Sequence, residues 1–112
     1  ILGVNGSGDW IPAAAGTAVQ PKRWAIEREY MGGDYNTAYA TGDAVKVATT
    51  PPGVRINALI ANTVNVAKGG LLEVGATAGT LRPVTTGVPV AVSLEALNNT
   101  SGANARLRVE IV

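Results

Sequence analysis

Glycine and proline interrupt this chain so often that its apolar segments have no room for long helices. The sequence holds 14 Gly and 6 Pro in 112 residues. Turn signals recur roughly every eight to twelve residues, a spacing typical of short strands in small β proteins. Pro51-Pro52-Gly53 ends a strand, because proline supplies no amide hydrogen to a ladder and glycine permits positive φ. The sequence therefore predicts an all-β fold, either a small β-sandwich or a partly open β-barrel.

The clearest strand signal lies at the end of the chain, over residues 105–112. Apolar and charged side chains alternate there, as expected for a strand with one face on a core and the other in solvent. The apolar positions are Ala105, Leu107, Val109 and Ile111, and the charged positions are Arg106, Arg108 and Glu110.

Further strands are expected over residues 23–31, 44–49, 71–74, 80–84 and 88–97. In the first, the alternation places Trp24, Ile26 and Tyr30 on one face. Pro83 fits only at an edge, a bulge or a strand end. In the last, Val90 and Val92 are suited to burial.

Two segments also fit helices. Residues 23–31 contain Glu and Arg, which favour helices, but the aromatic and β-branched content and the glycines that follow favour a strand. Residues 54–68 carry apolar side chains at both helical and strand spacings. Their asparagines compete with the helical backbone for hydrogen bonds, so we expect two strands that meet around residues 61–63.

The first part of the chain reads differently from the rest. Residues 1–22 hold short apolar pieces between glycines and prolines, and none predicts a helix or a strand with a partner of its own. We expect an extended N-terminal arm over residues 1–22 and a β domain over residues 23–112. Trp10 beside Ile11 marks a contact site, because a solvated tail does not normally carry large apolar groups. The arm either packs against its own domain or reaches a neighbouring subunit.

Charge and composition disfavour several classes of partner. The formal net charge is +1 and the basic residues are scattered, so we expect no nucleic acid and no anionic membrane as partners. No apolar stretch approaches the roughly 20 residues that span a bilayer. The apolar residues are mainly Ala and Val, with no Phe, and small side chains each contribute little hydrophobic stabilisation. A core of this kind gains from assembly with other subunits.

The sequence lacks the usual catalytic residue types. It contains no Cys and no His, which removes thiolate nucleophiles, imidazole bases and the usual zinc ligands. Glu27 and Glu29 share a strand face, where two solvated carboxylates are the simpler interpretation than a glycosidase pair. No calcium-loop or phosphate-loop spacing is present, so we expect no enzyme, no metal and no cofactor. Asn-x-Ser/Thr triplets begin at Asn5, Asn98 and Asn99, a pattern common by chance.

The segment from Gly42 onward resembles the capsid decoration, or cement, proteins of tailed bacteriophages. The resemblance rests on Gly-Asp-Ala-Val-Lys-Val, on a Lys-Gly-x-Leu turn at Lys68–Leu72, on the strand after Gly79 and on Gly-Val-Pro-Val-Ala-Val at Gly87–Val92. It covers residues 42–112, and residues 1–41 match nothing position by position. The family implies a β-rich fold, commonly trimeric, on the outside of a capsid where several major capsid protein subunits meet.

From this resemblance we expect a virion structural protein on the outer capsid surface, with the major capsid protein and its own copies as partners. A carbohydrate-binding module with a stacking platform of Trp10, Trp24 and the tyrosines is an alternative, and so is a tail-tube or head-completion protein. The candidate interface residues are Ile1, Leu2, Trp10, Ile11, Trp24, Tyr35, Tyr39, Arg106 and Arg108.

Overall fold

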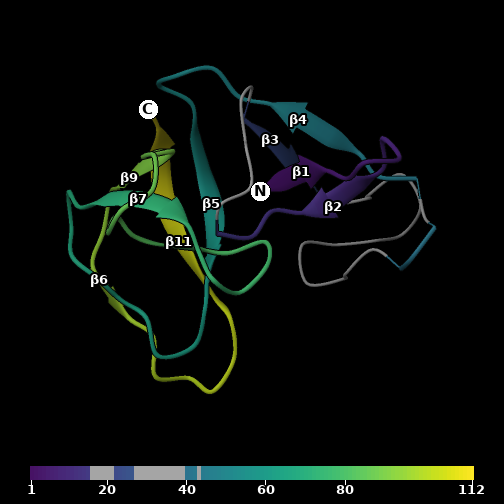
Figure 1. The fold of residues 1–112 in the computed structure, drawn as a ribbon. Coiled ribbons are helices and arrows are strands. Elements are labelled where there is room, and N and C mark those ends of the chain that lie inside the picture. Colours follow the sequence, from purple (N-terminus) through teal and green to yellow (C-terminus); the bar gives the residue numbers. More distant parts are fainter. Residues whose placement is uncertain (16–21, 27–39, 43) are drawn as a thin grey trace.

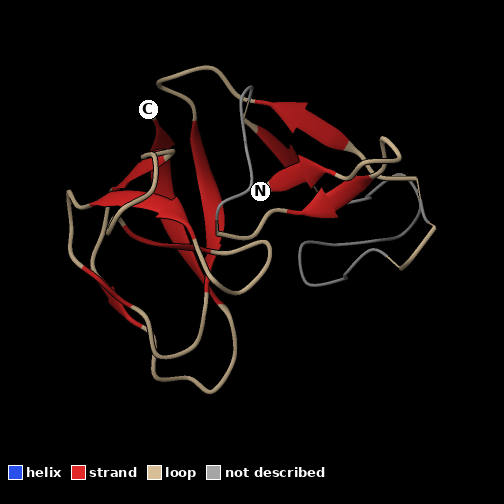
Figure 2. Ribbon diagram, viewed as in Figure 1, coloured by secondary structure: helices blue, strands red, loops and turns tan. Residues whose placement is uncertain are grey.

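The fold is taken from a computed structural model that describes residues 1–15, 22–26, 40–42 and 44–112. All regular elements in these ranges are β-strands (Figure 2). Five strands form a ring, and shorter two-stranded sheets lie beside it and at its lower end (Figure 1). The all-β prediction is confirmed.

The ring contains five strands, including the three longest of the described chain, β5 (Arg55–Ile60), β7 (Leu71–Val74) and β11 (Ala105–Ile111). The other two are β8 (Leu81–Pro83) and β9 (Ala91–Ser93). The order β5-β11-β9-β7-β8 is antiparallel at every seam. β8 then meets β5 in parallel through the single pair Ile60–Leu81. Of the two predicted forms, the partly open barrel is therefore the one found.

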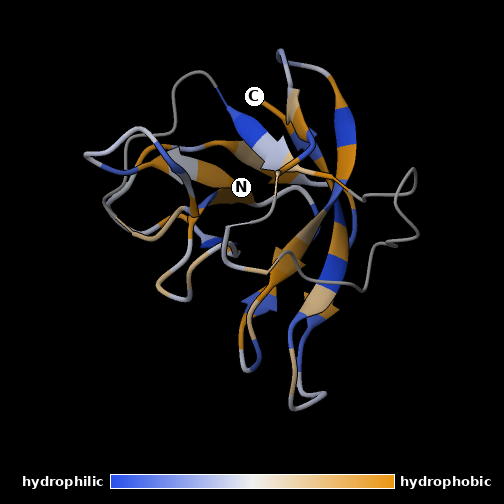
Figure 3. Ribbon diagram, turned by 90° about the vertical axis from the view of Figure 1, so that its right-hand side faces the viewer, coloured by the Kyte–Doolittle hydropathy of each residue, from blue (hydrophilic) through white to orange (hydrophobic). Residues whose placement is uncertain are grey.

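Alternation along the strands builds the core inside this ring. Hydrophobic and hydrophilic residues alternate visibly along the longer strands (Figure 3). In β11, Leu107, Val109 and Ile111 are buried while Arg106 and Arg108 are exposed, as predicted. The other fully buried large side chains include Ile60, Val66, Leu72, Leu81 and Val90.

A short sheet of β6 (Asn65–Val66) and β10 (Leu97–Asn98) closes one end of the ring. The chain reaches β6 through a bend at residues 61–63, where Thr63 has a φ of 70°. This bend confirms the prediction of two strands in place of a helix. The buried Asn99 side chain ties it down, because Nδ2 contacts the carbonyl oxygens of Ile60, Ala61 and Ala103 at 3.1, 3.0 and 2.9 Å.

Beside the ring lie two more two-stranded sheets. One pairs β1 (Leu2–Val4) with β2 (Trp10–Pro12), and the other pairs β3 (Arg23–Ala25) with β4 (Val47–Thr49). The expectation that residues 1–22 hold no paired strand is wrong, because β1 and β2 form a hairpin. It escaped the sequence reading because each strand is only 3 residues long, too short to show a period.

The hairpin is packed onto the ring. Ile1, Ala13 and Trp24 belong to the same buried apolar cluster as the ring residues. The Gly79 amide also donates to the Ala13 carbonyl at 2.7 Å. In the hairpin, the first of the two interpretations of the arm, packing against its own domain, is the one observed.

Two predicted strand faces need correction. In β9 the inward residues are Ala91 and Ser93, while Val92 is half-buried. Val90 is buried as predicted, so two consecutive residues, Val90 and Ala91, are both buried. Ile26 is exposed rather than sharing the buried side of Trp24, and Tyr30 lies outside the described residues.

Candidate interaction surface

The turn between β1 and β2 is organised by one asparagine. Asn5 Oδ1 accepts hydrogen bonds from the Ser7 and Asp9 amides at 2.9 and 3.0 Å, and Asn5 Nδ2 donates to Asp9 Oδ2 at 3.3 Å. Gly8 has a φ of 86°, which glycine adopts without steric cost. This side-chain network fixes the register of the short hairpin.

That register places two apolar side chains opposite each other in solvent. Val4 pairs with Trp10, and they are 47% and 39% exposed. The Arg23 guanidinium lies over the Trp10 ring, 5.2 Å from its centroid, a cation–π contact worth about 0.5–1 kcal/mol at an exposed site. We call Val4, Trp10 and Arg23 the hairpin patch.

The other candidates near the N-terminus are placed differently. Ile1 and Leu2 are buried and Ile11 is half-buried, so Trp10 is the most exposed of these predicted contact residues. Trp24 is also buried, and its Nε1–H donates to Thr50 Oγ1 at 2.8 Å. It packs in the core and does not share an exposed stacking platform with Trp10. Tyr35 and Tyr39 lie outside the described residues.

Arg106 and Arg108 lie on the outward face of β11. Across the β5–β11 seam, Arg108 is opposite Asn57 and Glu110 is opposite Arg55. Arg55 Nε and Glu110 Oε1 form an exposed ion pair at 3.1 Å. A shallow depression of about 230 Å³ is lined by Arg55, Ile56, Asn57 and Arg108. This face is polar and suited to hydrogen bonding with a partner.

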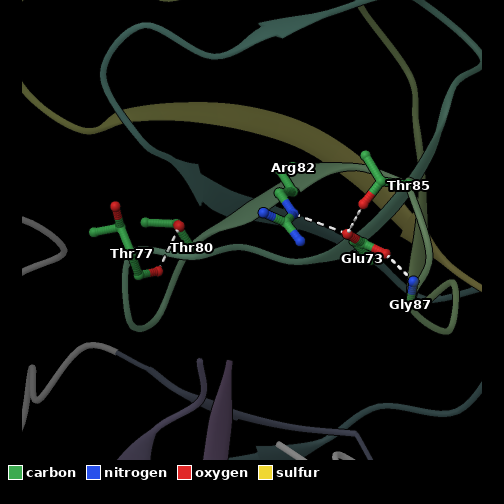
Figure 4. A network of polar contacts seen from close by, with 6 residues as sticks. All are labelled: Glu73, Thr77, Thr80, Arg82, Thr85 and Gly87. Atoms are coloured by element: carbon green, nitrogen blue, oxygen red, sulfur yellow. Dashed lines mark hydrogen bonds and ion pairs between the residues drawn. The ribbon is translucent and has the colours of Figure 1, made fainter. Parts of the chain in front are cut away.

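A buried carboxylate on β7 holds a loop across the outside of the ring (Figure 4). Glu73 is 2% exposed. One carboxylate oxygen accepts from Arg82 Nε at 2.8 Å and Thr85 Oγ1 at 2.9 Å, and the other accepts from the Gly87 amide at 2.6 Å. Burial alone would raise the pKa of Glu73, but these hydrogen bonds outweigh it and hold that pKa below its ordinary value.

The loop held by Glu73 joins two strands on opposite sides of β7. Pro83 and Ala91 both pair with Leu72, from β8 and β9 respectively, so residues 84–90 cross over β7. Gly87 is needed at the crossing, since a Cβ there would lie 2.4 Å from Glu73 Oε2. Beside it, Val88 is 70% exposed and lies on this loop, away from the hairpin.

Several of these surface residues escaped the sequence reading. Val4 would have followed from reading Asn5-Gly6 as a hairpin signal between two short strands. Arg23 and Val88 carry no local signal, because their placement depends on contacts between distant segments. The same holds for Glu73, whose partners Arg82, Thr85 and Gly87 come from beyond the next turn.

Among the described residues, no three His, Cys, Asp or Glu side chains gather as a metal site would require. The part of the chain that the structure describes also contains no helix of the length and apolarity needed to cross a membrane.

Searches against family models, curated proteins and solved structures found no match to this chain. The resemblance to capsid decoration proteins therefore stays a prediction from the sequence.

Proposed function

We propose that this protein is a non-enzymatic virion structural protein that decorates and stabilises the outer surface of a viral capsid. It binds major capsid protein subunits and assembles as a homotrimer. The observation that carries the proposal is the hairpin patch, in which a hydrogen-bonded turn sets an exposed valine opposite an exposed tryptophan and an arginine lies over the tryptophan ring. Tryptophan and arginine are the residue types most enriched among interface hot spots.

The small core supports a function in assembly. Almost half of its buried apolar side chains are Ala or Val, with Ala13, Ala58 and Ala91 among them. Such a core gains stability when the protein binds a partner, by mass action. On a capsid lattice the many equivalent contacts also act together, so that weak individual contacts give firm attachment.

The hairpin location changes how the proposal is best tested. Removing residues 1–20 would delete Ile1 and Ala13 from the core and would confound folding with binding. Surface substitutions at Val4 and Trp10 leave the core intact, because both side chains are exposed. We therefore choose the double variant Val4→Ser, Trp10→Ala.

The experiment measures attachment to particles built from the major capsid protein of the same virus. Wild-type protein is expected to sediment with the particles and to add density on their outer surface in electron micrographs. Native mass measurement is expected to show a trimer. The double variant is expected to lose at least about 1.4 kcal/mol of binding free energy, which is a tenfold weaker affinity.

Val88→Ser is the matched control, since it removes an exposed apolar side chain from the ring and leaves the hairpin unchanged. Wild-type protein that fails to attach to the particles would overturn the decoration function. If the double variant still attaches as tightly as the wild type, the hairpin patch is not part of the interface, and the decoration function itself is not contradicted.

A further inference from the structure

The hairpin turn contains a chemically reactive pair. Asn5 is followed by Gly6, and no other asparagine in the sequence precedes a glycine. The backbone amide of a glycine approaches a neighbouring carboxamide easily, because no Cβ hinders it. Around Gly6 there is open space, since a Cβ built there would meet no atom within 4 Å.

The surroundings of the Asn5 carboxamide favour attack on its carbon. Two backbone amides, from Ser7 and Asp9, already donate to Oδ1 at 2.9 and 3.0 Å. Preorganised donors of this kind stabilise the negative charge that develops on a carbonyl oxygen in acyl transfer. Within the described residues the Gly6 amide donates no hydrogen bond, so the nucleophile is not engaged elsewhere.

We propose that Asn5 is a self-deamidating residue whose own turn supplies the oxyanion donors. The Gly6 nitrogen bonds to Asn5 Cγ and gives up its proton to water. The Ser7 and Asp9 amides hold the oxyanion of the tetrahedral intermediate. The bond from Cγ to Nδ2 then breaks, and the nitrogen takes a proton from water and leaves as ammonia. Water opens the resulting succinimide at either carbonyl, which gives aspartate or isoaspartate.

Either product weakens the turn. An aspartate at position 5 places a carboxylate beside Asp9 Oδ2, where Asn5 Nδ2 now donates at 3.3 Å, and like charges at that distance repel. An isoaspartate adds a methylene to the main chain, which shifts the pairing of Val4 with Trp10. The reaction therefore disassembles the hairpin patch with time, whether or not the protein coats a capsid.

The test follows the peptide that contains Asn5 in the full-length protein at mildly alkaline pH by mass spectrometry. It records the small mass gain when the side-chain –NH2 group is replaced by –OH, and it separates the isoaspartyl from the aspartyl form. The same chain kept in urea gives the rate without the folded turn. Asn98 and Asn104, which precede no glycine, serve as internal controls.

We expect Asn5 to deamidate at least as fast in the folded protein as in urea, with isoaspartate among the products. Gly6→Ala is expected to slow the folded reaction by about tenfold, which is about 1.4 kcal/mol in the barrier. Asn5→Asp is expected to change the Trp10 fluorescence. A folded rate below the rate in urea, or an unchanged rate in Gly6→Ala, would overturn the proposal.

Discussion

Single buried polar side chains fix the loops of this protein. Glu73 holds residues 84–90 against β7, and Asn99 holds the bend between β5 and β6. Each of these buried side chains has its own polar atoms satisfied by the loop that it holds, and a buried polar group is costly when it is left unpaired. Substitutions at these residues should therefore act on particular loops as well as on stability.

Glu73→Gln should lower the free energy of unfolding at neutral pH. It should also make that free energy depend less on pH in the acid range. The pKa of Glu73 is held below its usual 4.5 in the folded state, so the carboxylate contributes stability above that pH. This contribution is lost as the pH falls through the folded-state pKa. The stability difference between wild type and variant should therefore shrink below pH 4.5, as measured by urea unfolding across a pH series.

Glu110→Gln is the control for this series, because Glu110 forms an ion pair with Arg55 that is far more exposed than the pair of Glu73 with Arg82. An exposed pair contributes about 0–1 kcal/mol. A stability difference for Glu73→Gln that stays constant across the acid range would contradict the predicted role of its carboxylate.

Asn99→Ala should destabilise the protein by about 1–3 kcal/mol, because it removes the donor to buried carbonyl oxygens. The neighbouring Asn98 is exposed, so Asn98→Ala should change stability by less than about 0.5 kcal/mol. Chemical denaturation measures both. Equal effects of the two variants would show that the hydrogen bonds of Asn99 add nothing to stability.

The burial of Asn99 also argues against glycosylation at the Asn-x-Ser/Thr triplet that begins there.

At the scale of elements, the two faces of β11 should differ in how much their side chains contribute to stability. Leu107→Ala should cost about 2–5 kcal/mol, because Leu107 is fully buried in the ring. Arg108→Ala, one residue along on the exposed face, should cost less than about 0.5 kcal/mol. Thermal or urea unfolding compares the pair. Similar losses at both positions would contradict the inward and outward assignment.

The elements that the sequence predicts well are those with a local signal. β7 and β11 show their apolar pattern directly, and Pro83 ends β8 as its missing amide requires. Turn glycines follow the same rule: Gly53 and Gly69 both adopt positive φ.

Elements and surfaces that depend on distant contacts were not predictable in this way. β1 and β2 are too short to show a period. The inward face of β9 does not continue the alternation from Val90, because Val90 and Ala91 are both buried. Trp10 stood out as a candidate because a large exposed apolar group is informative by itself, whereas Arg23 reaches it only through the packing of β3 beside the hairpin.

At the scale of the whole molecule, the ring and the flanking sheets share one buried cluster. The sequence contains 2 Trp, Trp10 and Trp24, and both lie outside the ring. Tryptophan fluorescence therefore reports on the flanking sheets, while far-ultraviolet circular dichroism is dominated by the ring. The two unfolding curves should coincide, since a shared core predicts one cooperative transition. Separate midpoints would mean that the hairpin unfolds independently.

The seam between β8 and β5 should be the mechanically weakest part of the ring. Every other seam of the ring is an antiparallel ladder, whereas this one rests on the pair Ile60–Leu81. A load that pulls these strands apart meets the least resistance there, so the cylinder should unroll into a flat sheet before any ladder is broken. In a protein proposed to stabilise a capsid, the direction of a force across this seam would decide how much load one subunit bears.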